Sequence, residues 1–143
     1  MKSYTEFLYE NFSKHKLYRG SSSINPFDKS EGRNAGSHPS HWLGVFCTPD
    51  KKVAESYGSG GFVFTFLYNI KNGYKMAYNE LVNIKNKTEA ISIRRKLIRN
   101  GYDSIKLMPI TDEPWPTEYV FFYPETQLKL IKKEEVNVNN KSK

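Results

Sequence analysis

Three short segments of this 143-residue chain place a polar side chain within or beside an apolar strand pattern. They are Tyr18–Ser21, with the sequence YRGS; Gly44–Thr48, with the sequence GVFCT and followed by Ala54–Tyr57; and Thr117–Phe122, with the sequence TEYVFF. In the last segment, Glu118 opens an aromatic strand, where a carboxylate loses solvation unless it is paired or half exposed. Taken alone, this pattern favours a strand-end glutamate that faces water.

Apolar periodicity predicts the elements that would position these segments. We expect strands at 16–20, 42–48, 62–70, 102–108, 118–123 and 127–131, and helices at 3–14, 49–57, 78–84 and 88–99. The 62–70 strand is nearly continuously apolar and should lie centrally in its sheet. Thr88 is expected to cap the 88–99 helix. These elements predict an α+β domain with a mixed or antiparallel sheet, and a long polar loop at 21–41.

Length and composition favour one domain with a modest core. Only 38% of the residues are apolar, but 10 Tyr, 9 Phe and 2 Trp can each bury a large surface. We expect a single domain at 1–132 and a polar tail at 133–143. The net charge of +7 attracts nucleic acid, acidic proteins or phosphate-bearing ligands, although solubility alone also accounts for it.

Cysteine and histidine content does not indicate a disulfide or metal framework. Cys47 is the only cysteine, and its spacing from His15, His38 and His41 matches no common set of metal ligands. The first residues lack the apolar run of a signal peptide, and no apolar stretch reaches the length of a membrane span. We therefore expect a cytoplasmic protein, in the host cytoplasm if a phage encodes it, with no metal and no membrane partner.

In their order and local sequence, the three segments resemble the ADP-ribosyltransferase superfamily. TEYVFF is similar to the Asn-Glu-Tyr-Ile-Val-Tyr strand of the poly(ADP-ribose) polymerases, whose motif also has a Gln where Gln127 stands. YRGS resembles their Trp-His-Gly-Ser. GVFCT, with VAESY at Val53–Tyr57 after it, resembles their Gly-Ile-Tyr-Phe-Ala and Ser-Ala-Asn-Tyr. The resemblance runs from about Leu17 to Ile131.

This resemblance implies an ADP-ribosyltransferase-like fold, in which split mixed or antiparallel sheets form a cleft for NAD⁺ and short helices flank them. It implies NAD⁺ as co-substrate and Glu118 as the catalytic carboxylate. Glu118 would stabilise an oxocarbenium-like ribose through the 2′-hydroxyl and orient or deprotonate the acceptor. The sequence GYDSI at Gly101–Ile105 also resembles compact phage and bacterial members. Because the Asp is a structural turn residue there, we expect no catalytic role for Asp103.

The resemblance also assigns cofactor-binding positions. Besides Arg19, they are Gly20, Ser21, Phe46, Thr48, Ser56 and Tyr57. The backbone of Gly20 would hold the nicotinamide amide, because glycine permits a close approach. Tyr57 would stack on the nicotinamide ring, and Phe46 would either pack against that ring or belong to the core. Thr48 and Ser56 both bring a hydroxyl near the nicotinamide, and the sequence does not choose between them.

Two positions depart from the polymerase and toxin patterns. Arg19 stands where the polymerases have His; the toxin-like transferases have Arg there, which contacts the NAD⁺ phosphates and braces the site. Pro116 stands where arginine-modifying members carry Glu or Gln, so modification of arginine through that motif is disfavoured. The loop Met108–Thr117, with Trp115 near its end, would read the acceptor.

The sequence therefore predicts an NAD⁺-dependent mono-ADP-ribosyltransferase, a phage or bacterial effector that modifies a host macromolecule. We expect a monomer whose catalytic residues are Glu118 and Arg19, with a protein rather than a nucleic acid as acceptor. Three alternatives stay open: a catalytically inactive binding module on the same fold, an NAD⁺ glycohydrolase, and a transferase that acts on nucleic acid.

Overall fold

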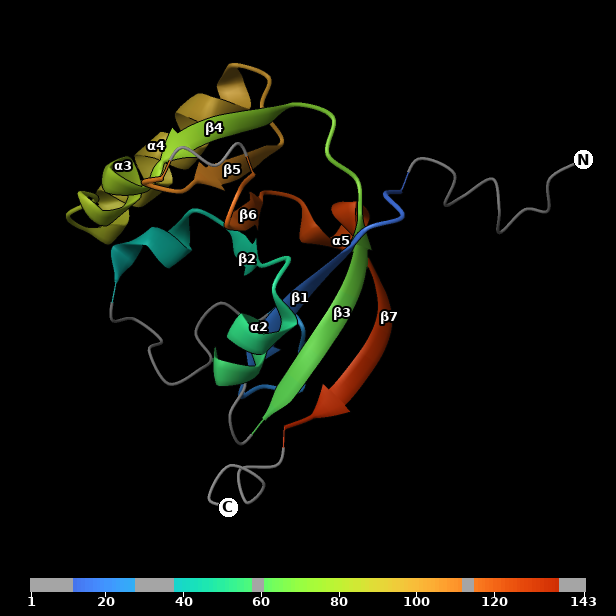
Figure 1. Cartoon of the computed structure of the whole chain (residues 1–143). Coiled ribbons are helices and arrows are strands. Elements are labelled where there is room, and N and C mark those ends of the chain that lie inside the picture. The colour runs from blue at the N-terminus through green and yellow to red at the C-terminus, as the bar shows by residue number, and fades with distance from the viewer. Residues whose placement is uncertain (1–11, 28–37, 58–60, 112–114, 137–143) are drawn as a thin grey trace, which may run out of the picture.

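The fold contains two β-sheets, which a computed structural model describes over residues 12–27, 38–57, 61–111 and 115–136 (Figure 1). The first sheet has three antiparallel strands in the order β1-β3-β7. Their bounds are Lys16–Ser21, Phe62–Tyr68 and Leu128–Glu135. As expected, the apolar 62–70 segment lies at the centre of its sheet, between two partner strands.

The second sheet has four strands in the order β2-β6-β5-β4. Their bounds are Val45–Cys47 for β2, Glu118–Phe121 for β6, Ser104–Met108 for β5 and Gly73–Ala77 for β4. β4 and β5 run parallel, whereas the other neighbours are antiparallel. A small α+β domain with antiparallel and mixed sheets is thus confirmed.

Short helices connect these strands. They are η1 (Pro39–Trp42, 3-10), α2 (Lys51–Tyr57), α3 (Tyr78–Val82), α4 (Lys87–Arg99) and α5 (Pro124–Gln127). α3 and α4 form the crossover between the parallel strands β4 and β5, as such a pair requires. No helix in the described residues is long and apolar enough to cross a membrane.

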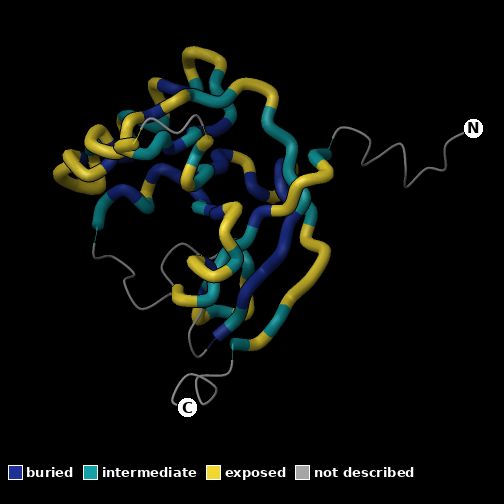
Figure 2. The backbone as a smooth tube through the Cα atoms, in the orientation of Figure 1, coloured by how far each residue is buried: buried dark blue, intermediate teal, exposed yellow. Residues whose placement is uncertain are grey.

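Two apolar clusters lie on opposite sides of the four-stranded sheet. Val120 belongs to the cluster that receives Ala90 and Leu97 of α4, while its neighbour Phe121 belongs to the cluster shared with Phe64 of β3. This division follows from the two-residue period of a strand. Figure 2 shows the result: β3 is buried along most of its length, whereas the outer turns of α4 are exposed.

The two sheets are joined where β1 passes the end of β2. The Tyr18 N–H donates to the Thr48 carbonyl at 2.8 Å, and the Thr48 N–H donates to the Tyr18 carbonyl at 2.8 Å. We call this pair of hydrogen bonds the Tyr18–Thr48 bridge. It brings the first two sequence segments, YRGS and GVFCT, side by side.

Several predicted boundaries were wrong. The strand expected at 42–48 begins at Val45, since Trp42 ends η1, and the last strand continues beyond Ile131 to Glu135. β4 was not predicted at all. The cap of α4 is Asn86, whose side chain accepts from the Glu89 N–H at 2.8 Å, rather than Thr88. Most of the helix expected at 3–14 lies outside the described residues.

Gly44, directly before β2, provides a test of the fold. A Cβ there would lie 2.5 Å from the Phe121 carbonyl oxygen, which belongs to the backbone of β6 and cannot move alone. We expect Gly44→Ala to lower the free energy of unfolding by about 1–3 kcal/mol, as measured by urea denaturation.

Gly73→Ala is the matched control in the same sheet. A Cβ at Gly73 would lie 2.9 Å from Cε of Lys106, the far end of a flexible side chain that can turn away. We therefore expect the control to lose less than about 1 kcal/mol. Equal losses in the two variants would contradict the packing around Gly44.

Candidate functional site

Glu118 is the first residue of β6, and its position on the sheet follows from the strand register. It lies opposite Leu107 of β5, and Cys47 of β2 lies opposite Tyr119, the next residue along. By alternation Glu118 shares its face with Val120, which is fully buried in the cluster beneath α4. The side chain itself is half-buried at the open end of that face.

The Glu118 carboxylate forms no hydrogen bond or ion pair with any residue that the structure describes. Burial raises the pKa of Glu118 from 4.5 to about 7. A half-buried carboxylate without a partner is costly for the fold, and such groups are concentrated at functional sites.

Tyr57 lies close to Glu118, and Tyr78 lies close to Tyr57. Tyr57 ends α2 and is 50% exposed; Tyr78 begins α3 and is 41% exposed. Burial raises the pKa of Tyr57, and the nearby charges of Glu118 and Tyr78 raise that pKa further. The structure thus brings Glu118 and Tyr57 together, as the sequence predicted, and places Tyr78, which the sequence analysis did not identify, beside Tyr57.

Arg19 of β1 fixes the backbone on the other side of the site. Its Nε donates to the Pro26 carbonyl at 2.9 Å, and its Nη1 donates to the Phe46 carbonyl at 3.0 Å. These bonds tie the loop after β1 to β2. In this position Arg19 is a brace, one of the two roles that the resemblance gave to an arginine here.

Cys47 lies between the two charged residues. Burial raises the pKa of its thiol to about 12, the Arg19 guanidinium lowers that pKa, and the Glu118 charge raises it. Both charges therefore act on the same buried sulfur. The thiol remains protonated at neutral pH and is not a nucleophile there.

Thr48 links the Tyr18–Thr48 bridge to the strand that carries Glu118. Its buried hydroxyl donates to the Thr117 carbonyl at 3.3 Å and accepts from the Asp50 N–H at 3.1 Å. Ser56 differs, because it is exposed and its hydroxyl donates to the Val53 carbonyl of its own helix at 2.7 Å. Of the two candidate hydroxyls, Thr48 is thus the one bonded beside Glu118.

The remaining predicted residues lie on β1 and β2, close in sequence to the Tyr18–Thr48 bridge. Gly20 pairs with Val63 near the Ser21 end of the β1–β3 ladder. Ser21 is buried, and its hydroxyl accepts from the Ser23 N–H at 3.1 Å, so it shapes the loop after β1. Phe46 lies opposite Val120 and packs, partly buried, against the cluster beneath α4.

Two polar residues of the resemblance have structural roles. The Gln127 amide is buried: it donates to the Asp103 carbonyl at 3.0 Å and accepts from the Tyr123 N–H at 2.8 Å. The Asp103 carboxylate accepts from the Lys71 N–H at 2.8 Å and the Asn72 N–H at 3.2 Å. Asp103 therefore holds the turn before β4, in agreement with the structural role expected for it.

Histidines and acidic residues do not form a metal site within the residues that the structure describes. His38 instead caps η1: its Nδ1 accepts from the Ser40 N–H at 3.0 Å. The groups gathered at the candidate site are the Glu118 carboxylate, the phenols of Tyr57 and Tyr78, and the Arg19 guanidinium.

The raised pKa of Glu118 predicts how stability depends on pH. Between pH 4.5 and about 7 the folded protein holds a proton that the unfolded chain releases, so unfolding becomes easier as pH rises. The full shift corresponds to at most about 3 kcal/mol, and partial solvent exposure reduces this value.

Glu118→Gln removes that titration. We expect the free energy of unfolding of Glu118→Gln, minus that of the parent, to increase across the same pH range in urea denaturation series. A difference that stays constant with pH would show that Glu118 is not desolvated in the folded state.

Known proteins do not add a functional assignment. Neither a protein-family model nor a curated protein matches this chain. A functional proposal must therefore rest on the arrangement of the residues around Glu118.

Proposed function

We propose that this protein is an NAD⁺-dependent mono-ADP-ribosyltransferase and that Glu118 is its catalytic carboxylate. The observation that carries the proposal is the half-buried Glu118, without a counter-charge from the described residues and beside the exposed Tyr57. A cationic, planar ligand suits both groups. The nicotinamide ring of NAD⁺ is such a ligand.

The arrangement of strands supports an ADP-ribosyltransferase-like fold. The three segments of the resemblance lie on β1, on β2 with α2, and on β6. The Tyr18–Thr48 bridge joins the first to the second, and the register Cys47–Tyr119 joins the second to the third. Segments that are distant in the sequence thus converge on one place, as a shared binding site requires.

The chemistry follows from the charges. In the proposed reaction the bond between the ribose carbon and nicotinamide breaks, and nicotinamide leaves with the electron pair. The acceptor forms a bond to that carbon and loses a proton. Positive charge develops on the ribose, so an ionised Glu118 stabilises the transition state more than the ground state.

Arg19 would contribute through position and charge. Its guanidinium already holds the carbonyls of Pro26 and Phe46, which keeps β2 against the loop after β1. Its positive charge also favours the diphosphate of NAD⁺ in this region. Lysine cannot replace it, since one ammonium group does not reproduce the planar, two-sided geometry.

The acceptor would be read by the loop between β5 and β6. Of its described residues, Ile110 is 82% exposed and Trp115 is 73% exposed, so large apolar side chains stand free next to the catalytic strand. Exposed apolar groups of this kind mark contact surfaces. Pro116 occupies the position where arginine-modifying members carry Glu or Gln, so their pattern is absent here. We expect the transfer of a single ADP-ribose unit.

Glu118→Gln tests the proposed catalytic role. The variant keeps the shape of the side chain but not its charge, so transfer of label from NAD⁺ to macromolecules of a cell extract should fall by about 100-fold or more. Mass spectrometry of the treated extract measures the transfer. Glu125→Gln, which removes an exposed carboxylate from α5, is the matched control and should retain activity.

The outcomes separate the alternatives. Release of nicotinamide without labelled acceptor would show an NAD⁺ glycohydrolase. A parent protein that neither binds nor consumes NAD⁺ would show an inactive module. Full activity in Glu118→Gln would remove the catalytic assignment of this residue.

NAD⁺ binding should also release a proton from Glu118. At about pH 6, one unit below its pKa of about 7, the carboxyl group of the free protein is mostly protonated. The positive ring lowers that pKa, so binding ionises the group. Calorimetry in two buffers of different ionisation enthalpy should report up to about one proton for the parent and none for Glu118→Gln.

A further inference from the structure

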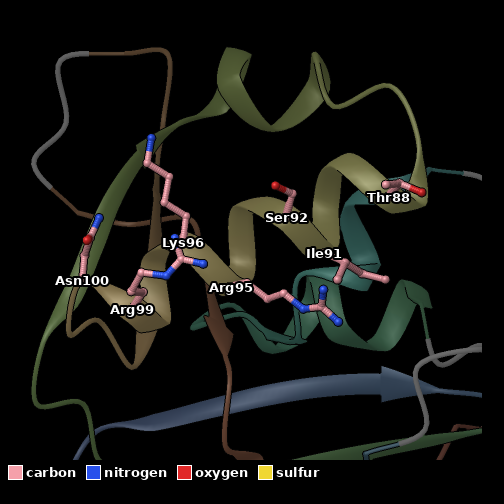
Figure 3. A pocket seen from close by; sticks show the side chains of 7 residues that line it. All are labelled: Thr88, Ile91, Ser92, Arg95, Lys96, Arg99 and Asn100. Carbon is pink, nitrogen blue, oxygen red and sulfur yellow. The ribbon is translucent and has the colours of Figure 1, made fainter.

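The outward face of α4 carries an open, basic hollow (Figure 3). It is lined by residues at successive turns of the helix: Thr88, Ile91, Ser92, Arg95, Lys96, Arg99 and Asn100. Their spacing of three and four places them on one face, which extends about 18 Å along the axis. The opposite face of α4 buries Ala90 and Leu97 against the sheet, so this face is not needed for the fold.

The three cations in the hollow are not neutralised by the rest of the described protein. Arg95, Lys96 and Arg99 are exposed, and none of them forms an ion pair with a described residue. The neighbouring Arg94 differs, because its Nη2 donates to the Phe122 carbonyl at 2.9 Å. Attraction to the helix dipole accounts for Lys96 and Arg99 in the last turn, but not for Arg95.

The chemistry of the lining identifies the ligand class. Guanidinium, ammonium, hydroxyl and amide groups are the donors that bind phosphate oxygens, and the hollow contains all four kinds but no carboxylate. Ile91 is its only apolar residue among those described, whereas protein partners usually bury an aromatic or apolar centre. Nucleic-acid interfaces are more polar and more positively charged.

We propose that this face of α4 binds the phosphate backbone of a nucleic acid. The linear array of donors suits a chain of repeated phosphates, and the net charge of +7 draws such a polymer to the protein. Binding is independent of sequence, since the hollow offers cations and hydroxyls rather than an element that enters a groove. The surface is separate from Glu118 and stands whether or not the transferase function is correct.

The test compares two variants that lose three positive charges each. Arg95→Gln/Lys96→Gln/Arg99→Gln changes the hollow, and glutamine preserves helix propensity. Lys14→Gln/Lys16→Gln/Lys71→Gln changes exposed lysines that also form no ion pair with a described residue. Fluorescence anisotropy with a short labelled RNA and a DNA strand of mixed sequence, over a salt titration, measures binding, and circular dichroism verifies folding.

The α4 variant should bind about tenfold more weakly or worse, and its slope of log K against log salt should be shallower by about 2 for a single strand. The control should bind as the parent does. Arg95→Gln alone, which changes a residue outside the last turn, should show an intermediate loss of affinity. This single variant provides the test if the triple variant does not fold.

Three results would overturn the proposal. They are no binding by the parent protein, equal losses in the two triple variants, and displacement of the nucleic acid by poly-glutamate at equal charge concentration. The last result would make an acidic protein the partner.

Discussion

The Tyr18–Thr48 bridge joins the two sheets that carry Arg19 and Glu118. β2 has only three residues, yet it pairs with β6 on one side and reaches β1 through these two backbone hydrogen bonds. Thr48 is buried, so its backbone groups must find partners within the protein. These two bonds help to hold the three-stranded sheet beside the four-stranded one, together with the apolar cluster that Phe64 and Phe121 share.

The Arg19 side chain and the Thr48 hydroxyl extend this constraint in two directions. Arg19 reaches across to the Phe46 carbonyl, while Thr48 reaches the Thr117 carbonyl, one residue before Glu118. A small displacement of β2 would therefore change the position of the guanidinium and of the carboxylate together. Sites that tolerate little misplacement are usually held by such supporting bonds rather than by their reactive groups.

Glu118 is the exception to an otherwise consistent strand. Its neighbours Val120 and Phe121 are fully buried, and a hydrophobic residue at its position would complete the pattern. The protein instead keeps an ionisable group where its charged form is disfavoured. Local rules are broken in this manner mainly where function requires it.

Sequence patterns predicted the elements with strong periodicity and failed where three-dimensional proximity decides. β3 and α2 were found because their apolar or helical patterns are continuous. β4 was missed because Gly73 and Lys75 interrupt a very short apolar pattern. Tyr78 could not be found, since its closeness to Tyr57 depends on how distant strands pair, which no local pattern expresses.

The placement of β7 determines when the site can be assembled during synthesis. β7 pairs along the whole of β3, from Phe62–Glu135 to Tyr68–Leu128, and Leu128 completes the core between the sheets. The local unit of β4, α4 and β5 can form early, but the β3–β7 contacts are long-range and form late. β7 follows Glu118 in the chain, so Glu118 leaves the ribosome before the strand that closes this core. The candidate site can therefore assemble only after β7 has also left the ribosome.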